Sequence, residues 1–223
     1  MQNKNSHFIV AIDGPAGSGK STVSKLIAGK LGLLYIDTGA MYRALTLKAM
    51  REGADLEDAD ALTNLARNTK IDLRNVSGSL KVFLDGEDVS ALIRTPELTN
   101  NVKFIARVPG VRREMVNSQR IIGGRSSAVL EGRDIGTVVF PDARFKFYLD
   151  ADVEERSKRR HKELLEAGQD ADLGKIKNDV IRRDESDMNR DVGALKKAPD
   201  AVLIDTTDLS IEEVTEKLLS YIK

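Results

Sequence analysis

Near the start of the chain, Gly14–Ser21 fits the pattern G-x-x-x-x-G-K-[ST], in which glycine, lysine and a hydroxyl residue stand at fixed positions. This pattern is typical of a phosphate-binding loop, whose backbone N–H groups face a polyphosphate. Lys20 would contact the β- and γ-phosphates, and the Ser21 hydroxyl would hold Mg²⁺. The alternative is a glycine-rich turn that binds nothing. The residues expected to bind ATP are Gly14, Pro15, Ala16, Gly17, Ser18, Gly19, Lys20, Ser21 and Thr22.

A phosphate loop alone fits a switch GTPase, a motor ATPase or a small-molecule kinase. Guanine-specific switches need an Asn-Lys-x-Asp element after a later strand, whereas the only Asn-Lys pair here, Asn3-Lys4, lies in the N-terminal tail. A GTPase is therefore disfavoured. A chain of this size with a second charged region is better suited to transfer between two small bound molecules.

Arginine is concentrated in one part of the chain. Twelve of the 18 arginines lie from Arg112 to Arg190, although 35 Lys and Arg balance 35 Asp and Glu over 223 residues. This overall balance excludes bulk attraction to nucleic acid or to an anionic membrane, because both partners select for a cationic excess. The ten Phe and Tyr residues, with no Trp, also disfavour stacking platforms for single strands. We expect neither partner.

Two arginines, Arg156 and Arg160, are four residues apart on an expected helix. Like charges at this spacing repel by a few tenths of a kcal/mol unless they share an anion. A polyphosphate is a suitable anion. Glu163 and its neighbours could equally neutralise these arginines as a solvated helix face, so both interpretations remain open.

Further along, Arg183, Asp187 and Arg190 are spaced four and three apart, which predicts that they share one helical face. One interpretation is an ordinary intrahelical salt-bridge ladder. The other is a clamp in which the arginines hold phosphate and the aspartate holds a sugar hydroxyl.

Charged residues also follow two expected strands. Glu131-Gly132-Arg133-Asp134-Ile135-Gly136 comes after one, and Asp37-Thr38-Gly39 with Arg43 comes after another. Open α/β sheets bind ligands at the carboxyl ends of their strands. Because charges near the core of a sheet need partners, we expect both loops to belong to a functional site.

The elements that would position these residues alternate between strands and helices, which predicts an α/β fold with a central parallel sheet flanked by helices. Short runs around Asp85-Gly86, at 71–74, 80–84 and 87–89, predict a small antiparallel insert. The expected main strands are 8–12, 33–36, 128–130, 145–149 and 201–204. The expected helices cover 23–31, 40–52, 96–107, 111–122, 153–166 and 173–189, followed by a terminal helix with a Ser210/Glu213 capping box.

The chain contains no cysteine, which excludes disulfides and thiolate metal sites and fits a reducing cytoplasm. Met1–Ser6 is polar, and the apolar run after it is too short for a signal segment or a spanning helix. We therefore expect a cytoplasmic protein, and a monomer.

Assembled in order, several stretches resemble the nucleoside monophosphate kinases, and among them the bacterial cytidylate kinases. The resemblance covers nearly the full length. It implies a P-loop kinase fold with a core at 1–37 and 128–223, a lid at about 154–170, and a monophosphate-binding region at 38–127. The stretches that carry the resemblance are IDGPAGSGKST, DTGAMYR, EDVSALIRT, PGVRREM, EGRDIGTVVFPDA and RRDESDMNR.

The resemblance also implies roles for individual residues. Arg112 and Asp134 would face the cytosine ring, and Arg183 and Asp187 would bind the phosphate and sugar of the acceptor. The implied ligands of the acceptor phosphate are Thr38, Arg43, Arg133 and Arg190. The implied catalytic residues are Lys20 and Arg133, together with the lid arginines Arg156 and Arg160.

The implied activity is Mg²⁺-dependent transfer of the γ-phosphoryl group of ATP to CMP or dCMP. The rival hypotheses are a kinase of the same fold with another acceptor, such as UMP, AMP or a non-nucleotide, and a nucleotide-binding regulator without turnover. Two departures from the family pattern affect this assignment. Glu131 stands where an Asp is frequent, and Lys103, which cannot accept a hydrogen bond, stands where a serine commonly touches the base.

Overall fold

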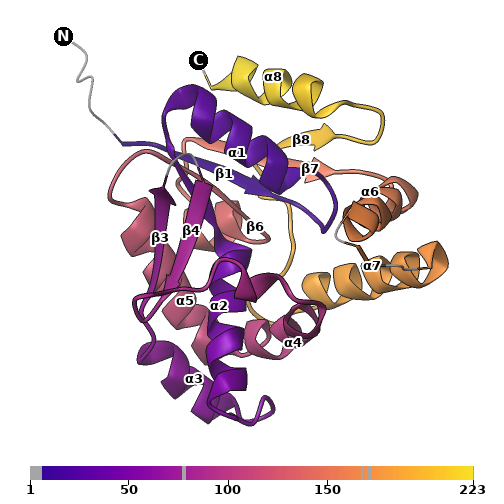
Figure 1. The fold of residues 1–223 in the computed structure, drawn as a ribbon. Helices are drawn as coiled ribbons and strands as arrows, with labels where there is room; N and C mark the ends of the chain where they lie inside the picture. The colour runs from indigo at the N-terminus through magenta and orange to yellow at the C-terminus, as the bar shows by residue number, and fades with distance from the viewer. Residues whose placement is uncertain (1–6, 77–78, 167, 170–171, 223) are drawn as a thin grey trace.

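The computed structural model describes residues 7–76, 79–166, 168–169 and 172–222; the polar opening Met1–Ser6 lies outside them. Its centre is a five-stranded parallel sheet in the order β2-β6-β1-β7-β8, which places the strand before the phosphate loop in the middle (Figure 1). The strands are β1 (Ile9–Asp13), β2 (Leu34–Asp37), β6 (Ala128–Gly132), β7 (Phe145–Asp150) and β8 (Val202–Asp205). The predicted parallel sheet is confirmed.

Alternate side chains of the central strands enter two different hydrophobic clusters. Val10 and Ile12 of β1 pack with α1 (Lys20–Leu31) and α8 (Ile211–Tyr221) on one face. Ala11, between them, packs on the other face with α2 (Thr38–Arg51) and α5 (Pro109–Gly123). Helices therefore cover both faces, as a parallel sheet requires.

The region between β2 and β6 carries the small antiparallel sheet, in the order β3-β4-β5 (Ile71–Val76, Ser79–Leu84 and Glu87–Asp88). The hairpin between β4 and β5 turns at Asp85 and Gly86, which have positive φ values of 50° and 96°. This is the geometry that an Asp-Gly turn favours, so the predicted hairpin is confirmed. The region also contains α3 (Ala59–Arg67), the 3₁₀ turn η1 (Leu92–Arg94) and α4 (Pro96–Ala106).

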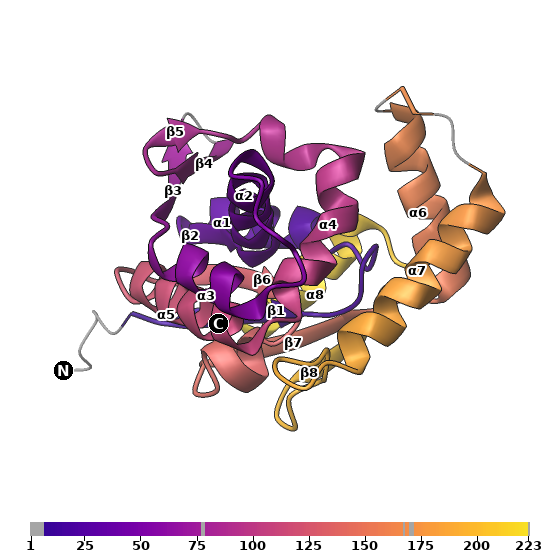
Figure 2. The ribbon, with the colours of Figure 1, turned by 90° about the horizontal axis from the view of Figure 1, so that it is seen from below.

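After β7, α6 (Val153–Glu166) and α7 (Leu173–Met188) pack against each other at one side of the molecule (Figure 2). The two helices lie at the opposite side of the sheet from the antiparallel insert. The expected lid at 154–170 coincides with α6 and the link after it, of which residues 167 and 170 lie outside the described part. The capping box of α8 is present, since Ser210 and Glu213 bond reciprocally.

Several local features differ from the sequence-based expectation. Helix α3 has no predicted counterpart, because only Leu62 and Ala66 are buried in its nine residues and the apolar pattern is short. A single π-helical segment, η2 (Ile135–Val139), continues the loop after β6. Helix α7 ends at Met188 with Asn189 as its C-cap, so the predicted end at Asn189 is one residue too long.

Within the described residues, no helix combines the length and apolar character that crossing a membrane requires.

Candidate active site

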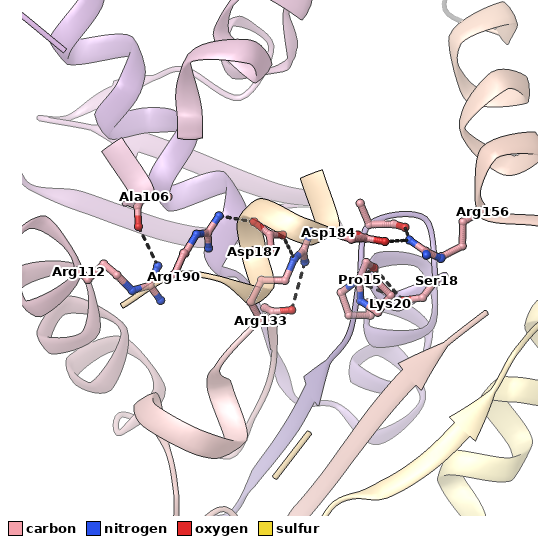
Figure 3. A network of polar contacts seen from close by, with 12 residues as sticks. Pro15, Ser18, Lys20, Ala106, Arg112, Arg133, Arg156, Asp184, Asp187 and Arg190 are labelled. Atoms are coloured by element: carbon pink, nitrogen blue, oxygen red, sulfur yellow. Dashed lines mark hydrogen bonds and ion pairs between the residues drawn. The ribbon is translucent and has the colours of Figure 1, made fainter. Parts of the chain in front are cut away.

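Acidic residues mark the carboxyl edge of the main sheet. Asp13, Asp37, Asp150 and Asp205 are the last residues of four strands, and β6 ends in Glu131-Gly132. Several of the charged side chains singled out in the sequence form a row in Figure 3, namely Arg112, Arg190, Asp187, Arg133, Lys20 and Arg156. Parallel strands thus bring together residues far apart in the sequence, such as Arg156 and Ala16, which are 140 residues apart and share a hydrogen bond.

The phosphate loop is packed tightly between β7 and α6. Gly14 has a φ of +150°, and a Cβ atom there would lie 2.0 Å from the carbonyl oxygen of Leu149. A Cβ at Gly17 (φ +79°) would lie 3.0 Å from the carbonyl oxygen of Arg156. No side chain caps the N-terminus of α1, so its first N–H groups remain available to an anion.

Lys20 is buried inside the loop that it is expected to serve. Its Nζ donates to the carbonyl of Pro15 (2.5 Å) and to the Ser18 hydroxyl (3.2 Å), as Figure 3 shows. Burial, together with the charge of Arg133, lowers the pKa of Lys20 to about 7, although Glu131 opposes the shift. An anionic ligand would favour the charged form and provide acceptors for its protons.

The Ser21 hydroxyl, the expected Mg²⁺ ligand, donates to Glu131 Oε2 at 2.8 Å. The second carboxylate oxygen accepts from the Tyr35 hydroxyl. Hydroxyl and carboxylate oxygens suit Mg²⁺, which usually binds one or two protein groups plus phosphates and water. In the described part of the chain, no cluster of three or more His, Asp or Glu side chains could hold a metal alone. The residues present therefore fit an ion that arrives with a nucleotide.

Arg112 and Asp134 lie in direct contact, with 2.5 Å between Arg112 Nη2 and Asp134 Oδ2. Both are buried, and Arg112 also donates to the carbonyl of Ala106. Tyr42, whose hydroxyl has no hydrogen-bond partner among the described residues, lies under the Arg112 guanidinium at 5.5 Å from its ring centroid. Burial raises the pKa of Tyr42 to about 12, so it is protonated at neutral pH and can donate. Nothing in the sequence around Tyr42 predicted that it would lie next to Arg112.

Asp187 accepts from two arginines on different segments (Figure 3). Arg133 Nε lies 2.6 Å from one carboxylate oxygen, and Arg190 donates to the other. Although burial opposes ionisation, the arginines lower the pKa of Asp187. Arg190 follows the C-cap of α7, so the prediction that it shares a helical face with Arg183 and Asp187 is wrong. The chain turns after Asn189 and still brings Arg190 back to Asp187.

Arg183 makes no ion pair or hydrogen bond with any described residue, in contrast to the salt-bridge ladder considered from its spacing. Its side chain is exposed, yet nearby protein atoms remove part of its hydration. This loss and the charge of Arg133 lower the pKa of Arg183 to about 10, with Asp187 acting in the opposite direction. A guanidinium among other guanidiniums is a suitable ligand for an anion.

The first turns of α2, which begins directly after β2 where the sequence predicted a loop, contribute Thr38 and Arg43. The Thr38 hydroxyl donates to the carbonyl of Glu131 at 2.7 Å, which joins the start of α2 to the end of β6. Arg43 pairs with Asp37 at 3.0 Å, while its Nε has no partner among the described residues. Arg43 therefore retains a donor, whereas Thr38 would have to redirect its proton to bind a phosphate through its hydroxyl.

The two expected lid arginines have different surroundings. Arg156 is buried, donates to the carbonyls of Ala16 and Ala151, and pairs with Asp184 of α7 at 2.6 Å. Arg160 is half exposed and pairs with Glu163 at 3.0 Å, which matches the solvated-face alternative for this conformation. The structure thus brings Arg156, but not Arg160, against the phosphate loop.

Asp13 is buried and hydrogen-bonded at the site, whereas Lys103 is exposed. Asp13 accepts from the backbone N–H groups of Ile135 and Gly136, both at 2.8 Å, and burial raises its pKa to about 6. It links the phosphate loop to the loop of Asp134; its position at a strand end was the only signal. Lys103, in contrast, is exposed and lies over the Phe104 ring.

A phosphate loop with a buried lysine at the centre of a five-stranded parallel sheet, beside a row of arginines, defines a P-loop kinase. A solved shikimate kinase from Bacteroides thetaiotaomicron has a similar fold, with a TM-score of 0.52 and 13% identity over 97% of this chain and 99% of that one. At this identity the likeness concerns the fold alone.

Sequence comparison gives the family. A model of the family described as Cytidylate kinase matches residues 10–223. A cytidylate kinase of Geobacillus sp. (strain WCH70) is 50% identical over 213 residues, covering 96% of this chain and 95% of the relative. One from Desulforamulus reducens is 50% identical over 218 residues, covering 97% of each chain. The chain belongs to the cytidylate kinase family.

Proposed function

We propose that this protein transfers the γ-phosphoryl group of ATP to the phosphate of CMP or dCMP, yielding ADP and CDP or dCDP. The observation that carries the choice of acceptor is the buried contact between Arg112 and Asp134. Cytosine presents an amino donor at C4 beside ring acceptors at N3 and O2. A carboxylate can accept from the amino group while a guanidinium donates to the ring. The C4 carbonyl of uracil would oppose the carboxylate, acceptor to acceptor.

The remaining residues suit two phosphorylated ligands bound side by side. We assign the donor to the loop Gly14–Thr22 and the acceptor phosphate to Arg43, Arg133, Arg183 and Arg190, with Thr38 contributing after its hydroxyl turns. Asp187, held between Arg133 and Arg190, is placed to accept from a sugar hydroxyl while it orients both guanidiniums. Alignment of the two phosphates then supplies much of the rate enhancement.

No side chain needs to act as a general base. The second pKa of a phosphomonoester is about 6, so the acceptor oxygens are mostly deprotonated at neutral pH. Catalysis therefore rests on neutralising negative charge with Lys20, Arg133 and the arginines of α6. Mg²⁺, held through Ser21, would neutralise further charge on the phosphates. Closure of α6 over the donor would exclude water and limit ATP hydrolysis.

The direct test is the release of ADP from ATP and Mg²⁺ with and without CMP. We expect release that depends on CMP, and loss of most of it in Lys20→Ala, because the lysine that neutralises the transferring group is gone. The fold of the variant, checked by circular dichroism, should persist. Unchanged turnover in the folded variant would contradict the assignment.

A further inference from the structure

The Glu131 carboxylate, at the end of β6, has both oxygens occupied by hydroxyl donors. Oε2 accepts from Ser21, at the start of α1, and Oε1 accepts from Tyr35 of β2. The three side chains come from three different elements, α1, β2 and β6. Glu131 and Tyr35 are 5% and 6% exposed, so bulk water has little access to the bond between them. Ser21, in contrast, is exposed, so its hydroxyl can meet a ligand.

The sheet register explains why Tyr35 reaches this carboxylate. Strands β2 and β6 pair in parallel with Tyr35 opposite Val129 and Asp37 opposite Glu131. Tyr35 and Glu131 therefore project from the same face, offset by two residues along the strands. A phenol is long enough to span that offset, and the extra methylene of Glu131 relative to aspartate extends the carboxylate toward it.

The ring of Tyr35 is itself confined. It packs in the cluster formed by the sheet and α1, and the Lys25 ammonium lies 5.8 Å from its centroid. Lys25 is one helical turn beyond Ser21. The ring thus has little freedom to move its hydroxyl away from Glu131.

The direction of these bonds determines what Ser21 can offer a metal ion. A hydroxyl that donates its only proton to Glu131 must direct its lone pairs elsewhere. Without a second anchor, the Glu131 carboxylate could rotate about its last torsion, and the proton of Ser21 would no longer be fixed. Metal ligands are commonly oriented by such hydrogen-bonded partners, which do not themselves touch the ion.

We infer that Tyr35 is a positioning residue: its hydroxyl fixes the Glu131 carboxylate, which in turn orients the Ser21 lone pair toward the Mg²⁺ that accompanies the nucleotide. This inference rests on the proposed function. Tyr35 touches neither nucleotide nor metal, and it acts only through Glu131. Its removal should therefore weaken the contribution of the metal and leave the binding of metal-free nucleotide unchanged.

The test is calorimetric titration of the full chain with ADP, in EDTA and in Mg²⁺, which gives the gain in ADP affinity that the metal provides. Tyr35→Phe should reduce this gain by about 10-fold, the size of effect typical of partners one step from a metal, and leave the affinity in EDTA unchanged. Glu131→Gln should reduce it similarly. In the double variant, Tyr35→Phe should add nothing to the effect of Glu131→Gln, because the two act as one unit.

Thr215→Val is the matched control, since it also removes a buried hydroxyl that donates within the fold but lies in α8. Its gain should equal that of the wild type, even if its melting temperature falls. The role of Tyr35 would be overturned if Mg²⁺ raised the ADP affinity of Tyr35→Phe or of Glu131→Gln as much as that of the wild type. It would also be overturned if the effects of the two substitutions were fully additive in the double variant. If Mg²⁺ did not raise the ADP affinity of the wild type at all, the proposed function would be overturned as well. Failure of the role of Tyr35 is therefore distinguishable from failure of the proposed function.

Discussion

At the scale of single residues, the site combines cationic side chains whose pKa values are lowered with donors that have no partner among the described residues. Lys20 is buried with a pKa of about 7, and Arg183 has a pKa lowered to about 10. In both cases lost hydration and nearby positive charge disfavour the charged form. Polyphosphate would reverse both effects, so the cost of assembling this positive charge is offset when the ligand binds.

Nucleotide binding should therefore be coupled to proton uptake by Lys20. At pH 8 a lysine with a pKa near 7 is mostly neutral in the free protein, and phosphate oxygens should restore its charge. Affinity should fall as pH rises above about 7, because a proton must be taken up first. Titration with ADP at pH 8, in two buffers of different ionisation enthalpy, should show uptake approaching one proton.

The variant Lys20→Met should lose this uptake, whereas Lys217→Met, on the exposed face of α8, should retain it. Uptake of equal size in Lys20→Met would assign the proton to another group.

Asp134 should set the preference for cytosine over uracil. Replacing it with alanine removes the acceptor for the C4 amino group, so we expect the ratio of kcat/KM for CMP over UMP to fall by about 10-fold or more, as for hydrogen bonds to charged groups. Asp142→Ala, in the exposed loop before β7, is the control. A selectivity ratio that matches the wild type would refute the proposed base contact.

At the scale of elements, α6 and α7 join the phosphate loop to the acceptor residues. The buried Arg156 of α6 binds both Ala16 in the loop and Asp184 of α7, and α7 carries Arg183 and Asp187. Movement of α6 would therefore shift residues at both ligand sites. We propose that α6 and the link after it act as the lid, and that residues 38–127 act as the monophosphate-binding region.

Arg160 tests the lid directly, because the ion pair that it forms is exposed. Its side chain and that of Glu163 are 44% and 61% exposed, so Arg160→Ala should change the free energy of unfolding by less than about 0.5 kcal/mol. Turnover should nevertheless fall at least about 10-fold if Arg160 reaches the transferring phosphoryl group on closure.

Glu163→Ala breaks the same ion pair and is the matched control: stability and turnover should both stay near wild type. Equal kinetic effects of the two substitutions would assign Arg160 to the helix surface rather than to the reaction.

At the scale of the whole molecule, a neutral chain forms a local anion site. The 35 positive and 35 negative residues cancel overall, yet the fold gathers arginines from α2, α5, α6, α7 and the loop after β6 at one sheet edge. Acids that end the strands lie among them. Such a local site suits two small phosphorylated ligands.

Local patterns predicted the order of the elements and the phosphate loop, because apolar periodicity and glycine spacing are properties of short segments. Helix α3 was not predicted because few of its residues are buried. The sequence did not predict the contacts of Tyr35 and Tyr42, and for Asp13 its position at a strand end was the only signal. A residue's partners across the sheet depend on strand order and register, which short segments do not reveal. The prediction that Arg190 lies near Asp187 is confirmed, but a turn after α7, and not a shared helical face, brings the two side chains together.

The central claim is that cytidine monophosphates are the acceptors. Its most direct test measures kcat/KM from ADP release for CMP, dCMP, UMP, AMP and a non-nucleotide acceptor such as shikimate, each with ATP and Mg²⁺. We expect CMP or dCMP to exceed every other acceptor by at least about 10-fold, the discrimination that the Arg112 and Asp134 pair should provide. An equal or higher value for UMP, AMP or shikimate, or ADP release that no acceptor stimulates, would contradict the account.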